Sequence, residues 1–132
     1  MRATTVALGG RALLLAGPSG VGKSSLALEL MSLGAGLVAD DVTELTDKNE
    51  LTASAPANLP EAIEARGLGI LHADLVGPTP VFAAVDLTRC AAARMPQAQE
   101  ISLLEHSIPL LHKPASGPVA AMLLQYLKQK MP

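Results

Sequence analysis

The eight residues from Gly17 to Ser24 combine residue types and a spacing that can hold a phosphate group. They read Gly-Pro-Ser-Gly-Val-Gly-Lys-Ser and fit the pattern G-x-x-x-x-G-K-[ST], whose backbone N–H groups converge on phosphate oxygens. Lys23 supplies a mobile positive charge for the β- and γ-phosphates, and the Ser24 hydroxyl can ligate Mg²⁺. The residues predicted to bind a nucleotide are Gly17, Pro18, Ser19, Gly20, Val21, Gly22, Lys23 and Ser24.

A second group that can do chemistry is the pair Asp40-Asp41, which follows the short apolar run Leu37–Ala39. Carboxylates at the end of a strand beside the phosphate loop can hold Mg²⁺, position a water or accept a proton from an attacking hydroxyl. Because neighbouring side chains of a strand point to opposite faces, the two aspartates are expected to have different roles. Turn formation is the alternative interpretation of the pair.

The elements that must position these residues are a strand before the loop and a helix after it. Residues 12–16 form a short apolar run typical of a buried strand, and residues 24–33 are rich in strong helix formers. Gly34 is a natural end for that helix. The order strand, glycine loop and helix directs the positive end of the helix dipole at a bound phosphate.

Two stretches together resemble the HPr kinase/phosphorylase family. Residues 17–41, GPSGVGKSSLALELMSLGAGLVADD, resemble the family's phosphate loop, helix and aspartate strand, with the same spacing from Lys23 to Asp41. Residues 63–71, IEARGLGIL, resemble the family's second signature: an aliphatic residue, Glu, one residue and Arg-Gly-Leu-Gly-Ile. A generic phosphate-loop ATPase has no reason to carry this second motif. The match covers residues 11–72.

The resemblance implies an enzyme that transfers phosphate from ATP to a serine of the small phosphocarrier HPr, and that in many members reverses this with inorganic phosphate. Residues 17–24 then bind ATP, and Ser24 and Glu64 help hold Mg²⁺. Asp41 is implied to be the proton acceptor in phosphorylation and the donor in the reverse reaction. Asp40 supports Asp41 or the metal, and Arg66 neutralises charge on the transferring group.

The sequence departs from the family pattern at two positions near the loop. Arg2 stands where members commonly have a catalytic-site His, and Ser25 stands where many have an acidic residue. The N-terminal domain of the longer members is missing, so the chain is expected to be the short form of the family. The resemblance further implies a homo-oligomer, typically a hexamer.

Composition indicates one cytoplasmic domain spanning residues 1–132. Aliphatic residues dominate the 49% hydrophobic content, and the net charge of −2 gives no strong attraction to nucleic acid or to anionic membranes. The single Cys90 fits a reducing compartment. Neither a membrane-spanning segment nor a signal peptide is predicted. His72, His106 and His112 lack metal-ligand spacing.

The predicted fold class is α/β: a single phosphate-loop domain of the HPr kinase/PEP carboxykinase type, with a central mixed sheet and flanking helices. We expect a hairpin turning at Gly9-Gly10, and a terminal helix over 119–130 whose Lys128 and Lys130 suit its dipole. Residues 61–65 are predicted as a short helical turn, and residues 88–100 as a mobile stretch without periodicity. Residues 101–104 are predicted as a weak strand, and Asp86 as a strand-end cap.

Two other functions remain open from the residues. One is another phosphate-loop enzyme, such as a small-molecule kinase or a nucleotide hydrolase, because the loop alone does not name the acceptor. The other is a nucleotide-binding regulatory module without transfer activity, a hypothesis motivated by Arg2 and Ser25.

Overall fold

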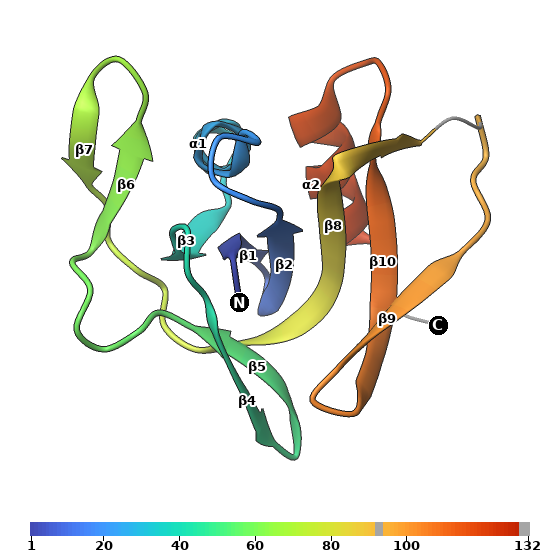
Figure 1. The fold of residues 1–132 in the computed structure, drawn as a ribbon, viewed down its shortest axis with the longest axis horizontal. Helices are drawn as coiled ribbons and strands as arrows, with labels where there is room; N and C mark the ends of the chain where they lie inside the picture. Colours follow the sequence, from blue (N-terminus) through green and yellow to red (C-terminus); the bar gives the residue numbers. More distant parts are fainter. Residues whose placement is uncertain (92–93, 130–132) are drawn as a thin grey trace.

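A computed structural model describes residues 1–91 and 94–129 of the chain (Figure 1). The two helices of this part are α1 (Lys23–Ser32) and α2 (Val119–Lys128). The strands are β1 (Ala3–Leu8), β2 (Arg11–Ala16), β3 (Gly36–Ala39), β4 (Glu44–Lys48), β5 (Glu50–Ser54), β6 (Ala62–Ala65), β7 (Gly69–His72), β8 (Thr79–Ala91), β9 (Gln99–Leu103) and β10 (His106–Pro114).

The main sheet is mixed, as predicted. Its strand order is β3-β1-β2-β8-β10-β9, with β2 parallel to β8 and β8 parallel to β10. The other neighbours in this order are antiparallel, and the hairpin β4–β5 joins the sheet through the start of β8. Strand β2, which leads into the phosphate loop, therefore lies inside the sheet.

The hairpin β1–β2 turns at Gly9 and Gly10, which have φ values of 59° and 76°. Two residues with positive φ give the turn whose twist matches the flanking strands, and glycine adopts it without steric cost. The predicted hairpin is confirmed. It places the start of β1 beside the end of β2, where the phosphate loop begins.

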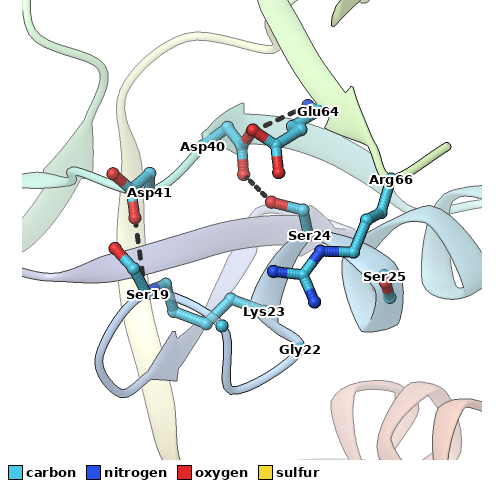
Figure 2. A pocket seen from close by; sticks show the side chains of 10 residues that line it. Ser19, Gly22, Lys23, Ser24, Ser25, Asp40, Asp41, Glu64 and Arg66 are labelled. Atoms are coloured by element: carbon cyan, nitrogen blue, oxygen red, sulfur yellow. Dashed lines mark hydrogen bonds and ion pairs between the residues drawn. The ribbon is translucent and has the colours of Figure 1, made fainter. Parts of the chain in front are cut away.

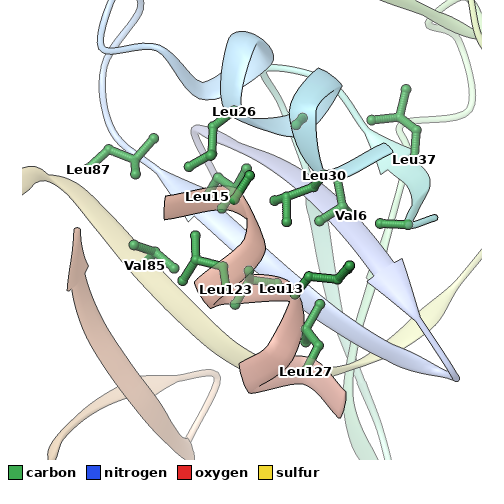
Figure 3. Close-up of a cluster of buried hydrophobic side chains, with 14 of the residues drawn as sticks. Val6, Leu13, Leu15, Leu26, Leu30, Leu37, Val85, Leu87, Leu123 and Leu127 are labelled. Atoms are coloured by element: carbon green, nitrogen blue, oxygen red, sulfur yellow. The ribbon is translucent and has the colours of Figure 1, made fainter. Parts of the chain in front are cut away.

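The core has two layers, one on each face of the sheet. Leu13 and Leu15 of β2 point to the face covered by both helices, where they pack with Leu30 and Leu123 (Figure 3). Leu14 points to the opposite face, toward residues of β5 and β10. Because β2 is buried on both faces, its sequence is a continuous apolar run rather than an alternating one.

Helix α1 ends at Ser32 with Leu33 as its cap, and Gly34 follows with a φ of 115°. The amide of Ala35 donates to the Leu30 carbonyl over 3.1 Å. This is the left-handed stop expected from the sequence. Helix α2 agrees with the predicted terminal helix up to Lys128, and the predicted role of Lys130 lies outside the described residues.

Three sequence predictions about the strands were wrong. Residues 62–65 form strand β6 and not a helical turn: they pair with β7, and alternate residues Ile63 and Ala65 are buried. In the stretch predicted to be mobile, residues 88–91 continue β8 and residues 99–100 begin β9, while residues 92–93 lie outside the described residues. Asp86 is consequently inside β8 and not at its end.

Strand β10 was not predicted at all. Its segment contains Pro109 and Pro114, which interrupt a strand pattern because proline cannot donate a backbone hydrogen bond. The strand nevertheless pairs with β8 on one side and β9 on the other. Within the described residues, no helix is both long enough and apolar enough to cross a bilayer.

Candidate active site

The phosphate loop connects β2 to α1 without an intervening segment. Gly22 caps the helix with a φ of 102°, and its carbonyl accepts the first helical hydrogen bond from the Leu26 amide. Gly17 has little room for a side chain, since an added Cβ would lie 2.8 Å from Cγ1 of Val21. The loop therefore has the close backbone turn that its sequence predicted, at the N-terminus of a ten-residue helix.

Lys23 places a buried cation at this loop. Its side chain is 4% exposed, and its Nζ donates to the Gly17 carbonyl over 2.6 Å. The same nitrogen lies 3.3 Å from Oδ1 of Asp41. The lysine charge is thus balanced by the aspartate that the sequence singled out.

Asp40 is held by three hydrogen-bond donors from three elements, and Figure 2 shows two of them, Ser24 and Glu64. Its Oδ1 accepts from the hydroxyls of Ser24, at 2.6 Å, and Thr4, at 2.9 Å. Its Oδ2 accepts from the backbone amide of Glu64 over 3.0 Å. The carboxylate therefore connects α1, β1 and β6.

The carboxylate of Asp41 has different partners from that of Asp40. Its φ of 64° turns the chain at the end of β3, and its backbone amide donates to the Thr4 hydroxyl over 3.0 Å. Its carboxylate contacts two cations, Lys23 through Oδ1 and Arg2 through Oδ2, the latter at 3.0 Å. About half of the side chain is exposed. Asp41 is consequently the accessible carboxylate of the pair, next to the loop.

The hairpin β6–β7 brings two further side chains over the loop. Glu64, from β6, lies near Asp40, and Arg66, from the turn that follows, extends toward Ser24 (Figure 2). These residues line one cavity of about 220 Å³ together with the phosphate loop. Its lining residues are Ser19, Gly20, Gly22, Lys23, Ser24, Ser25, Asp40, Asp41, Glu64 and Arg66.

Residues 1–84, more than half of the chain, match the family model of the HPr Serine kinase C-terminal domain. This chain belongs to that family. It is 46% identical over 74 residues to an HPr kinase/phosphorylase of Listeria welshimeri, in a match covering 54% of this chain and 24% of that protein. It is 51% identical over 65 residues to an HPr kinase/phosphorylase of Nitrosomonas europaea, covering 48% and 20%.

The chain thus spans between a fifth and a quarter of the length of these curated relatives. Among solved structures, it resembles the Hpr(Ser) kinase/phosphatase from Coxiella burnetii with a TM-score of 0.78 and 23% identity. That likeness covers 96% of this chain and 86% of the other, and it confirms the predicted fold class.

Most of the residues that the sequence singled out in this family member lie around one cavity, within the described part of the chain. The predicted loop residues that line it are Ser19, Gly20, Gly22, Lys23 and Ser24. Gly17 supplies the carbonyl to which Lys23 donates. Pro18 and Val21 complete the loop, and the Val21 amide donates to the Pro18 carbonyl over 3.3 Å. The sequence did not predict the contribution of Thr4, whose hydroxyl bonds both aspartates of the pair.

Asp86 lies next to the phosphate loop of this domain but not on the cavity. It pairs in register with Ala16, directly before the loop, and its carboxylate accepts from the hydroxyl and the amide of Thr88. These two hydrogen bonds, with a smaller contribution from Arg89, hold the pKa of Asp86 below its usual range. Asp86 lies inside β8, where the pairing with β10 shifts register directly after it, and it does not line the cavity that Asp40 lines.

The oxygen atoms around Ser24 suit Mg²⁺ as a metal better than they suit a transition metal. Hydroxyl and carboxylate oxygens are available from Ser24, Asp40 and Glu64, and Mg²⁺ is usually held by one or two carboxylates together with substrate phosphates. In the described residues, no cluster of three or more His, Cys, Asp or Glu side chains forms a self-sufficient metal site. A metal here would depend on a bound polyphosphate.

Proposed function

We propose that this chain is an ATP-dependent serine kinase domain that phosphorylates an HPr-like phosphocarrier. The proposal rests on the different surroundings of the two aspartates. Asp40 accepts hydrogen bonds from three donors, whereas the carboxylate of Asp41 is accessible and lies beside Lys23. A site that only binds nucleotide has no need of the second, accessible carboxylate. The curated relatives carry the name HPr kinase/phosphorylase, which supports the same reaction class.

The proposed mechanism assigns a step to each group. The loop amides and Lys23 bind the ATP phosphates, while Ser24, with Asp40 and Glu64, would hold Mg²⁺. A Mg²⁺ ion held there would neutralise charge on the phosphates. The acceptor serine oxygen bonds to the γ-phosphorus as the bond to the β–γ bridging oxygen breaks, the serine proton passes to Asp41, and ADP leaves. Arg66 balances charge on the transferring group.

The proposal extends to the reverse reaction with inorganic phosphate, for which Asp41 would return the proton. It also includes a single domain over residues 1–132, a homo-oligomer such as a hexamer, and a cytoplasmic location. These follow from the family resemblance and from composition, and they stay predictions.

The test is transfer from γ-labelled ATP and Mg²⁺ to purified HPr-type carriers encoded in the same genome. We expect label on one carrier serine, and none on a carrier with that serine changed to alanine. ATP binding without labelled carrier would favour the regulatory module. Label on a metabolite, or phosphate release without a carrier, would favour a small-molecule kinase or nucleotide hydrolase.

Exposed aliphatic side chains beside the cavity support a protein acceptor over a small polar one. Ile70 pairs directly with Glu64 across the β6–β7 hairpin, so the two side chains share a face. Ile70 is 74% exposed and Leu68, in the hairpin turn, is 82% exposed. A small phosphate acceptor would make no use of such a surface at the cavity mouth, whereas an apolar patch on a carrier would cover it.

Replacing Leu68 and Ile70 together by serine should raise the KM for the carrier about tenfold, since apolar area is lost from the contact. The KM for ATP should stay within about twofold, because neither side chain reaches the loop. Steady-state kinetics with varied carrier would measure this, with Leu104→Ser in the distant β9–β10 turn as the matched exposed control. An unchanged carrier KM would mean that the hairpin does not contact the acceptor.

A further inference from the structure

Arg2 contacts both the phosphate loop and the segment that holds the two aspartates, although it lies outside the cavity. Its carbonyl accepts from the amide of Gly17, the first residue of the phosphate loop, over 3.3 Å. It also forms an isolated bridge to Val42, directly after Asp41. The backbone of Arg2 thus lies between the start of the loop and the end of the aspartate pair, although Arg2 does not line the cavity.

The side chain of Arg2 makes the same connection. One nitrogen, Nη1, lies 3.0 Å from Oδ2 of Asp41 and donates to the Ser19 hydroxyl over 3.2 Å. Ser19 belongs to the phosphate loop, and Asp41 is the proposed proton acceptor. A planar guanidinium can bond to two such acceptors at once, which a lysine, as a flexible point charge, does less well.

Nucleotide binding changes the balance of charge around Asp41. In the structure, two cations share this carboxylate, Lys23 on Oδ1 and Arg2 on Oδ2. In a phosphate loop, the lysine serves the β- and γ-phosphates, so a bound nucleotide draws Lys23 away from Asp41. Arg2 is then the cation that still holds the carboxylate.

We propose that Arg2 is a positioning residue that fixes Asp41 relative to the phosphate loop when a nucleotide is bound. The inference rests on the proposed function, because it gives Asp41 the proton-accepting role. Arg2 does not line the cavity that would hold the phosphates, so it would act through Asp41. Its effect is on the turnover of the bound complex, since misplacing a reacting group by about 1 Å can cost up to about 100-fold in rate.

If Arg2 holds Asp41 through its permanent positive charge, the variant Arg2→His provides a specific test. An imidazole can pair with Asp41 only while it is protonated, and its ordinary pKa is about 6.5, raised by a neighbouring carboxylate. The charged groups that face this position from neighbouring elements are Asp41 after β3 and Lys23 at the start of α1. The terminal ammonium of Met1 is bonded to the Thr43 carbonyl. The histidine variant should therefore work at low pH and fail as the imidazole loses its proton.

The experiment compares carrier phosphorylation by the wild type with that by Arg2→His, Arg2→Lys and Arg2→Met, between pH 5.5 and 8.5 at saturating ATP. We expect Arg2→Met to lose about 10- to 100-fold in kcat at every pH, with the KM for ATP within about threefold. For each variant, the rate is divided by the wild-type rate at the same pH. This relative rate of Arg2→His should approach that of Arg2→Lys at low pH and fall to that of Arg2→Met at high pH.

Each other outcome has a clear meaning. A constant Arg2→His ratio across the pH range, or a loss confined to the KM for ATP, would overturn the positioning role and leave the kinase proposal intact. A lower Tm in all three variants with equal rate losses would make Arg2 merely structural. A wild type that labels no carrier would overturn the proposed function and, with it, this inference.

Discussion

Asp41→Asn should slow the transfer of phosphate to the carrier by about 10²- to 10⁴-fold, while ATP binding should stay within a few-fold of the wild type. The asparagine amide cannot accept the serine proton, and loss of a general base typically costs about 10²- to 10⁴-fold in rate. Asparagine also tolerates the left-handed backbone of this position, which has a φ of 64°, so the turn after β3 should persist. The effect would therefore be on chemistry and not on folding.

Labelled ATP gives the transfer rate of this variant, and a fluorescent ATP analogue gives its nucleotide affinity. Asp74→Asn is a matched control, because Asp74 is 93% exposed and its ion pair is with the surface residue His72. It should keep the wild-type rate. Equal labelling by the wild type and by Asp41→Asn would keep the kinase but remove Asp41 as its proton acceptor.

The sequence predicted the part of the site that is local in the chain. The glycine pattern of residues 17–24 needs a turn and a helix N-terminus, and the apolar run of β2 needs a buried strand, so this unit follows from local propensity. Strand geometry predicted different surroundings for Asp40 and Asp41, but both residues follow β3, which ends at Ala39, so this reasoning does not apply to them. The structure shows instead that a positive φ at Asp41 separates them.

The contacts that the sequence did not predict depend on pairing between distant segments. Thr4 looks like an ordinary residue of an apolar strand, and its hydroxyl gains a role only because β1 lies beside β3 in the sheet. The contact of Arg2 with Ser19 and Asp41 has the same origin. No local pattern encodes these neighbours, which come from the order β3-β1-β2.

The error at residues 61–65 has a different cause. Glu-Ala-Ile-Glu-Ala is composed of good helix formers, yet the segment pairs with β7 across the turn at Gly67, whose φ is 94°. Packing of Ile63 against the core and the bond from the Glu64 amide to Asp40 favour the extended form. Propensity is a weak preference of tenths of a kcal/mol per residue, and here the tertiary contacts outweigh it.

Asp40→Ala should lower both the stability of the free protein and the effect of Mg²⁺ on nucleotide binding. The alanine leaves the hydroxyls of Ser24 and Thr4 and the Glu64 amide without their shared acceptor. Loss of one partner of a charged, partly buried hydrogen bond costs about 1.5–3 kcal/mol, and three donors share this one. We expect the free energy of unfolding to fall by about 2–3 kcal/mol, as measured by urea unfolding without nucleotide.

Two further variants separate the structural role of Asp40 from its proposed metal role. Asp74→Ala, at an exposed ion pair, should change the free energy of unfolding by less than about 0.5 kcal/mol. Asp40→Asn keeps one carbonyl oxygen for the two hydroxyls but lacks the charge that attracts Mg²⁺. It should recover part of the stability while ATP binding stays insensitive to Mg²⁺. If Asp40→Asn kept the full Mg²⁺ effect, Glu64 and Ser24 would suffice for the metal, and Asp40 would serve only to join α1, β1 and β6.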